Sequence, residues 1–173
     1  MNKIFMTMIA FMFMSATAWA GSELEVKQGD KKFFKTAEGN AVLEFVFDNA
    51  TYDGRMPLTE KFSMSNLKKL AYSGFKQEFN DQCKKVKIVE DNSNVKYKFT
   101  VVITKMDQYF KVMGFIPGNA TKAWGTITVT DANNGEVLLV VDVDEVDGGA
   151  SPSPDETISD CFEEMGEQFS DLK

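Results

Sequence analysis

Among the side chains of this sequence, the carboxylates have the types and spacing that come nearest to those of a known kind of site. The stretch DVDEVDGG (142–149) puts Asp142 and Asp144 on one face of a predicted strand, and Asp147-Gly148 begins a loop after it. Oxygen ligands of this kind suit Ca²⁺. The spacing is one residue longer than the start of an EF-hand loop, so a solvated strand end is the simpler interpretation.

A second acidic stretch, DANNGE (131–136), also begins like a calcium loop. It departs from that pattern because Gly135 stands where the fifth-position ligand belongs and Glu136 stands at the glycine position. Asn134-Gly135 is instead a strong signal for the tight turn of a β-hairpin. We therefore predict no metal site and no cofactor, and keep a calcium-dependent domain as an alternative.

Histidine is absent from the 173 residues. This removes Ser-His and Cys-His nucleophile pairs, histidine general bases and histidine-based zinc sites. The sequence also has no phosphate-binding glycine loop, no G-x-S-x-G and no C-x-x-C. Two acids acting across a cleft remain available among the 26 acidic residues. We expect a protein that is not an enzyme, with a carboxylate-based hydrolase as the alternative.

The two cysteines could meet in the fold. Cys83 ends one amphipathic helical segment and Cys161 lies inside another, each on the apolar face. In an oxidising compartment they could form a disulfide. The other interpretation is a pair of buried free thiols that act as small hydrophobic residues.

An unusually apolar segment, YFKVMGFIPG (109–118), lies between two predicted strands, where a connection would normally be polar. It either extends the preceding strand into a hairpin whose side chains cap the sheet, or forms an exposed loop that binds a protein partner or an apolar ligand. Aromatic residues and Met are enriched at the cores of interfaces. The candidate binding residues are Tyr109, Phe110, Val112, Met113, Phe115, Ile116 and, nearby, Trp124.

The first twenty residues have the features of a secretory signal peptide. Lys3 gives a basic start, an apolar run follows, and Ala18-Trp19-Ala20 is a small-x-small cleavage site. No Cys follows the site, so we expect an exported protein, periplasmic or secreted, that carries no lipid anchor. No second apolar run predicts a transmembrane segment in the mature chain. The sequence has no basic stripe, which argues against nucleic acid as a partner.

Periodicity divides the remaining chain into an extended N-terminal segment, 21–39, and a single domain, 40–173. Residues 40–50 alternate as a strand does, 65–83 and 153–172 have helical period, and two further strand pairs lie between them. The predicted order is β-α-β-β-β-β-α, with an N-terminal edge strand as an addition. This order indicates an α+β two-layer sandwich, in which two amphipathic helices cover one face of a largely antiparallel or mixed sheet.

The order of these elements, the FIPG before a strand, and VTDANNGEVLLV followed by a closing helix together resemble a group of small exported bacterial envelope proteins of unknown function. Their fold is similar to the α/β domain at the N-terminus of TolB and in curli-type secretion lipoproteins. The resemblance covers residues 40–172 and implies a non-catalytic role in the cell envelope. This chain departs from the lipoprotein members because it lacks the lipidated Cys. The resemblance implies no particular site residue.

Overall fold

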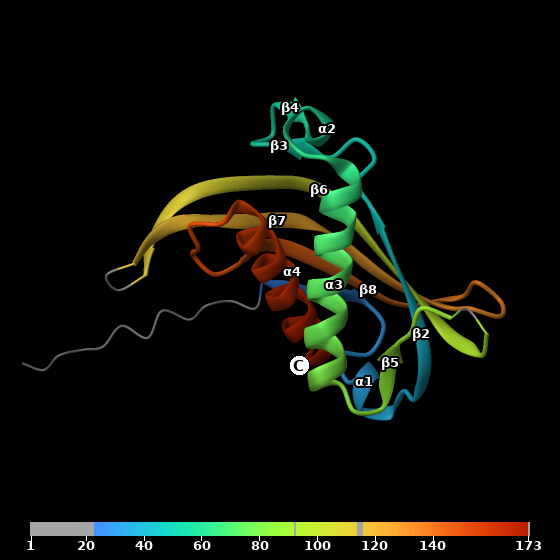
Figure 1. The fold of residues 1–173 in the computed structure, drawn as a ribbon. Coiled ribbons are helices and arrows are strands. Elements are labelled where there is room, and N and C mark those ends of the chain that lie inside the picture. The colour runs from blue at the N-terminus through green and yellow to red at the C-terminus, as the bar shows by residue number, and fades with distance from the viewer. Residues whose placement is uncertain (1–22, 92, 114–115, 173) are drawn as a thin grey trace, which may run out of the picture.

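The computed structural model describes residues 23–91, 93–113 and 116–172. Their strands form one sheet, and two long helices cover one face of it (Figure 1). The elements, in chain order, are β1 Leu24–Gln28, α1 Phe33–Thr36, β2 Gly39–Val46, β3 Thr51–Tyr52, β4 Met56–Pro57, α2 Leu58–Lys61, α3 Met64–Gln82, β5 Val86–Ile88, β6 Val95–Met113, β7 Ile116–Asp131, β8 Val137–Asp147 and α4 Pro154–Ser170.

The sheet is mixed, and its strands follow the order β1-β8-β7-β6-β2-β5. Strands β6, β7 and β8 form an antiparallel meander, and β1 adds to the outside of β8 in the antiparallel sense. By contrast, β2 runs parallel to both β6 and β5. The short strands β3 and β4 form a small ribbon that joins β6 at Lys105 and Met106. The predicted α+β sandwich with a largely antiparallel or mixed sheet is therefore confirmed.

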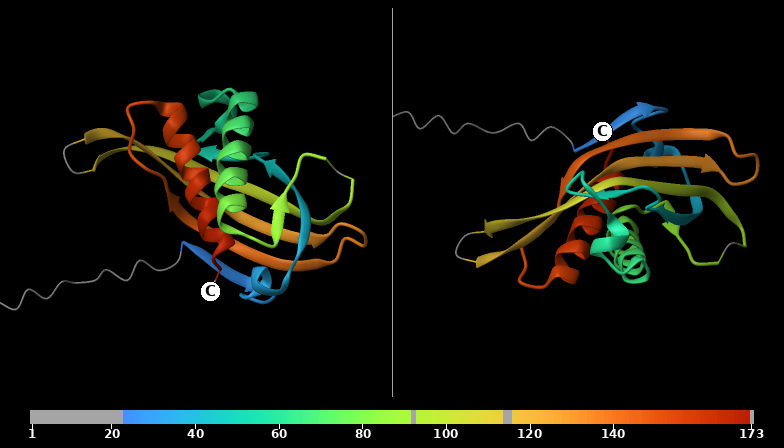
Figure 2. Two further views of the ribbon diagram at one scale, coloured as in Figure 1. Left: turned by 60° about the horizontal axis from the view of Figure 1, so that its bottom comes forward. Right: turned by 90° about the horizontal axis from the view of Figure 1, so that it is seen from above.

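The helices α3 and α4 lie side by side on the same face of the sheet and run in the same direction (Figure 2). Glycine allows them to approach closely, because a Cβ atom at Gly166 would lie 2.5 Å from the carbonyl oxygen of Phe75. Beneath the helices, the aromatic rings pack mostly edge to face, with centroids 4.9–6.2 Å apart, as such rings prefer. The rings of this cluster are those of Phe34, Phe75, Phe79, Phe99 and Phe169.

The faces of the main elements agree with their sequence patterns. In β2, Leu43 and Phe45 are buried and the alternate residues are not, as the period of two predicts. In α4, Ser153 is the N-cap and its hydroxyl accepts a hydrogen bond of 3.4 Å from the backbone N–H of Glu156. The segment 21–39 contains the edge strand β1, together with the short helix α1. The elements α1, β3, β4 and α2 were not predicted.

The possible disulfide between Cys83 and Cys161 does not form, and both residues are buried free thiols. Because α3 and α4 run parallel, Cys83 at the end of α3 lies beside Leu172 at the end of α4. Cys161 lies eleven residues earlier on α4, which is roughly 16 Å along the helix axis. A disulfide requires Cα atoms within about 7 Å. The Cys161 thiol instead donates a hydrogen bond of 3.4 Å to the carbonyl oxygen of Val146.

No helix among the described residues is long and apolar enough to cross a membrane.

Candidate functional site

The described residues of the apolar segment, 109–113 and 116–118, belong to the paired strands β6 and β7. Strands β6 and β7 pair from Tyr97 opposite Asp131 to Met113 opposite Ile116, with one shift of register between Ile103 and Lys105. The rest of the sheet ends earlier, because β3 pairs with β6 only to Met106 and β8 pairs with β7 only to Lys122. We call residues 107–113 and 116–121 the arm. It extends sideways past both helices and is the yellow hairpin in Figure 1.

The arm exposes large apolar side chains on one of its faces. Phe110 is 68% exposed and Val112 is 58% exposed, and the two are alternate residues of β6. Their partners on β7 are Asn119 and Pro117. The side chains of Met113 and Ile116 are not among those that the structure describes, and Phe115 lies outside the described residues. Exposed apolar groups that gather in one place often mark an interaction surface.

The other two predicted binding residues, Tyr109 and Trp124, lie on the opposite face of the same hairpin. The Tyr109 hydroxyl donates a hydrogen bond of 2.5 Å to Asp147 on β8, and the ammonium of Lys122 lies 4.6 Å from the ring centroid. Burial, reinforced by the hydrogen bond to Asp147, raises the pKa of Tyr109 above its ordinary value. Trp124 is half-buried, with the Lys105 ammonium 4.0 Å from its ring centroid. Tyr109 and Trp124 therefore make these contacts within the chain, and the contacts hold the base of the arm against the sheet.

A second set of contacts ties the arm to the N-terminal end of α4. Thr121 on β7 and Thr157 on α4 are buried, and their hydroxyl oxygens lie 2.9 Å apart. Asn119 and Ser151 exchange two backbone hydrogen bonds of 3.0 Å. Gly118 permits this approach, since a Cβ atom there would lie 2.9 Å from the backbone of Ser151. The direction of the arm is therefore set by the same residues that start α4.

The hydroxyl of Ser151 connects this contact to the helix cap. It donates a hydrogen bond to the carboxylate of Glu156 and accepts one of 3.1 Å from the backbone N–H of Ser153. The sequence shows Ser153 and Glu156 as a capping pair, but it gives no signal that Ser151 would hold the glutamate.

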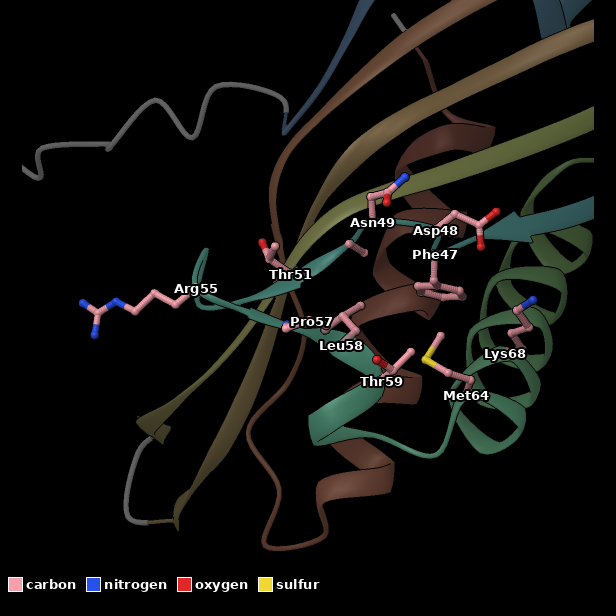
Figure 3. A pocket seen from close by; sticks show the side chains of 11 residues that line it. Phe47, Asp48, Asn49, Thr51, Arg55, Pro57, Leu58, Thr59, Met64 and Lys68 are labelled. Atoms are coloured by element: carbon pink, nitrogen blue, oxygen red, sulfur yellow. The ribbon is translucent and has the colours of Figure 1, made fainter.

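A hollow of about 590 Å³ lies away from the arm, between the end of β2, the β3–β4 ribbon and the start of α3. Phe47 and Leu58 contribute apolar surface, and Met64 and Lys68 line it from α3 (Figure 3). Arg55 points away from the other labelled side chains in Figure 3, and its guanidinium lies 3.7 Å from the carboxylate of Asp53. Sequence reasoning missed this hollow because the ribbon and α2 that build it are too short to give a periodic signal.

The carboxylates that suggested calcium or hydrolysis serve separate structural contacts. Asp142 lies 3.8 Å from the ammonium of Lys27, and Asp147 accepts the hydroxyl of Tyr109. In the DANNGE turn, Asp131 accepts the backbone N–H of Asn133 at 2.8 Å, and Gly135 has a positive φ of 74°. Across the described part of the chain, no group of three or more Cys, Asp or Glu side chains converges as metal ligands would.

Comparison with known proteins adds a likeness of fold. No protein-family model matches the chain, and no curated protein sequence matches it. A solved structure of PelC from Paraburkholderia phytofirmans is 15% identical and has a TM-score of 0.50, with 87% of this chain and 98% of that chain covered. A point variant of the same protein is 12% identical, with a TM-score of 0.44 and coverage of 85% and 95%. At this identity, the comparison shows that the chain shares the fold of PelC.

Proposed function

We propose that this protein is an exported, non-catalytic binding domain of the bacterial cell envelope, and that the arm docks a protein partner or an apolar ligand. The observation that carries the proposal is the exposure of Phe110 and Val112 on one face of the arm. Exposed apolar side chains that lie together among polar residues are typical of an interaction site. The predicted signal peptide supports the cell envelope as the location.

The way in which the arm is held also supports docking. A surface that binds a partner loses less free energy on association when it is ordered beforehand. The buried hydroxyl pair of Thr121 and Thr157 and the backbone bonds between Asn119 and Ser151 fix the base of the arm before any partner arrives. The PelC structure with the TM-score of 0.50 is a dodecamer, which supports protein–protein association as a use of the shared fold.

Photo-crosslinking in cells tests the proposal. A photoreactive amino acid replaces Phe110, and the matched control replaces Val137, which is also an exposed apolar residue but lies at the far end of the sheet in the β7–β8 hairpin. We expect a discrete adduct from position 110 and none from position 137. The absence of an adduct from position 110 in a correctly folded protein would remove the basis of the proposal.

A surface variant separates binding from folding. Phe110→Asp should change the free energy of unfolding by less than about 0.5 kcal/mol, because the side chain is exposed. The same variant should abolish the adduct when the photoreactive group stands at Val112, the neighbouring exposed residue of the same face. Phe99→Ala, in the fully buried core, should lower the free energy of unfolding by roughly 3–5 kcal/mol. It serves as the control for a residue that packs in the core.

A further inference from the structure

We propose that the N-terminal strand β1 is fastened to α4 by a proton, which Glu23 takes from the solvent and holds in a hydrogen bond to the side-chain amide of Gln168. In this state the carboxyl group and the amide make two hydrogen bonds to each other. Loss of the proton breaks one of the two, so β1 separates more readily from β8. The proposal does not depend on what the arm binds.

Glu23 lies immediately before β1, where β8 and the last turns of α4 meet. Its carbonyl oxygen accepts the backbone N–H of Asp144 at 2.8 Å, next to the pairing of β1 with β8. Its carboxylate accepts the side-chain amide of Gln168 at 2.8 Å and the backbone N–H of Asp147 at 3.4 Å. Both views of Figure 2 show the start of β1, in blue, beside the C-terminal end of α4, in red. One side chain therefore connects the first strand to the last helix.

The amide of Gln168 serves two carboxylates at once. Its nitrogen, Nε2, donates hydrogen bonds of 2.8 Å to both Glu23 and Glu164, and these bonds use both of its hydrogens. Its oxygen, Oε1, is buried and has no hydrogen-bond partner among the described residues. A buried acceptor without a donor costs free energy. Because an ionised carboxylate can only accept, neither glutamate can donate to Oε1 until it binds a proton.

A protonated Glu23 supplies this donor. The carbonyl oxygen of a carboxylic acid accepts an amide N–H, and its O–H group donates to the amide oxygen, so the two groups are complementary. The first of these bonds is present between Glu23 and Gln168 at 2.8 Å. A proton on the other carboxyl oxygen makes the second bond, to Oε1. The proton thus gives a buried acceptor its partner and removes one negative charge.

The groups around Glu23 favour this proton. Burial raises the pKa of the Glu23 carboxyl group above its ordinary value, and the charges of Glu164 and Asp147 also raise it. The hydrogen bonds from Gln168 and the backbone of Asp147 act in the opposite direction, but the pKa stays raised. No lysine or arginine of the described chain is among the groups that shift this pKa. The Cys161 thiol on α4 is also near, since the charge of Glu23 raises the pKa of that thiol.

The direction of the pH dependence follows from the raised pKa. The folded state holds the proton of Glu23 more tightly than the unfolded state, so the contribution to stability is full below the ordinary glutamate pKa of about 4.3. It is lost as the pH rises through the raised value of the folded state. The attachment of β1 is therefore tighter in acid and looser toward neutral pH.

The wild-type protein tests the proposal without any substitution. Carboxyl ¹³C NMR of the purified protein measures the pKa of Glu23, which we expect above the ordinary glutamate value of about 4.3. The side-chain amide protons of Gln168 should shift with the same midpoint, because the amide gains a hydrogen bond when Glu23 is protonated. A Glu23 pKa at or below the ordinary value, or a Gln168 amide that does not follow it, overturns the proposal.

Glu23→Gln imitates the protonated state at every pH. Its side-chain oxygen still accepts from Gln168, and its NH2 group donates to Oε1. The backbone amide of Asp144, which donates to the carbonyl oxygen of residue 23, reports the opening of β1 by hydrogen exchange. At pH 7, we expect this amide to exchange roughly threefold or more slowly in the variant than in the wild type. At pH 4, where most of the wild type is protonated, the two proteins should exchange alike.

Two further variants separate the proton from a simple loss of charge. Glu25→Gln removes an exposed carboxylate of β1 and should change the exchange of Asp144 little. In a Gln168→Met background, Glu23→Gln should no longer slow the exchange at pH 7, because Oε1 is absent. An equal slowing in Glu25→Gln, or a slowing that persists in the Gln168→Met background, would assign the effect to repulsion between carboxylates and overturn the proposal.

Discussion

Thr121 of β7 and Thr157 of α4 form a hydrogen bond of 2.9 Å between hydroxyl oxygens of two side chains that are both fully buried. The pair joins the base of the arm to the first turns of α4. The Thr157 hydroxyl also donates a hydrogen bond of 2.8 Å to the carbonyl oxygen of Pro154. A buried polar pair of this kind is stabilising only while each hydroxyl keeps a partner.

Thr121→Val keeps the volume of the side chain and removes one hydroxyl. We expect a loss of about 1 kcal/mol in the free energy of unfolding, measured with urea. The double variant with Thr157→Val should lose less than the sum of the two single variants, because each single variant already breaks the one hydrogen bond between the two hydroxyls. Strict additivity would contradict the view that the two hydroxyls act as a pair.

The close crossing of α3 and α4 should not tolerate a methyl group at Gly166. Alanine is the better helix former by about 1 kcal/mol, yet its Cβ would meet the carbonyl oxygen of Phe75 at 2.5 Å. We expect Gly166→Ala to destabilise the protein by roughly 1–3 kcal/mol, measured by thermal or urea unfolding. Gln77→Ala, at an exposed position of α3, is the control and should change little. A stabilised Gly166→Ala variant would mean that the helices lie farther apart.

Asp160 of α4 should make the stability of the protein depend on pH in the direction opposite to that of a salt-bridged acid. Burial raises the pKa of its carboxyl group, and the charges of Glu163 and Glu156 raise it further. The folded state therefore holds the proton more tightly than the unfolded state, so this contribution is present below the ordinary carboxyl pKa of about 4 and is lost as pH rises through the raised value.

Asp160→Asn removes this titration. The variant should be more stable than the wild type at pH 7, by less than about 1 kcal/mol because the group is partly solvated, and the difference should vanish at pH 3. Urea unfolding at the two pH values measures it. A variant that is less stable than the wild type at pH 7 would show that the aspartate makes a favourable contact as an anion.

The thiols of Cys83 and Cys161 should be free and inert in the folded protein. Both are buried, and burial raises the pKa of the Cys161 thiol above its ordinary value, which lowers its thiolate fraction. A thiol-reactive dye should label neither residue in buffer and both in urea. Treatment with a reducing agent should leave the melting temperature unchanged. A drop in melting temperature on reduction would reveal a bridge.

Residues that repeat with a regular period allowed most of the fold to be predicted. The stripe of Leu67, Ala71 and Phe75 fixes α3 and its buried face, and Asn134-Gly135 fixes the turn between β7 and β8. These signals are local, because each depends on neighbours a few residues away in the chain. The parallel pairing of β2 with β6 has no such local signal, since it joins Val42 to Lys98 across two helices and three short strands.

The arm was harder to predict for a related reason. Tyr109–Ile116 is almost continuously apolar and lacks the alternation that reveals a half-buried strand, while Gly114 and Pro117 are typical of turns. The strand conformation of Tyr109–Met113 comes from pairing with β7, and the direction of the arm comes from Ser151, more than thirty residues later in the chain. The exposure of Phe110 depends on where the helices end, which local periodicity cannot reveal.

The first strand of the domain and one of its last strands complete the sheet together. Leu24 of β1 lies opposite Val143 of β8, and Val26 lies opposite Val141. Contacts between such distant parts of a chain form slowly, and here they cannot form until most of the chain has been synthesised. A growing chain that lacks β8 and α4 leaves Phe45 without its contact with Phe162 and Phe99 without its contact with Phe169. The sheet and its helical cover can therefore be complete only when nearly the whole chain has been synthesised.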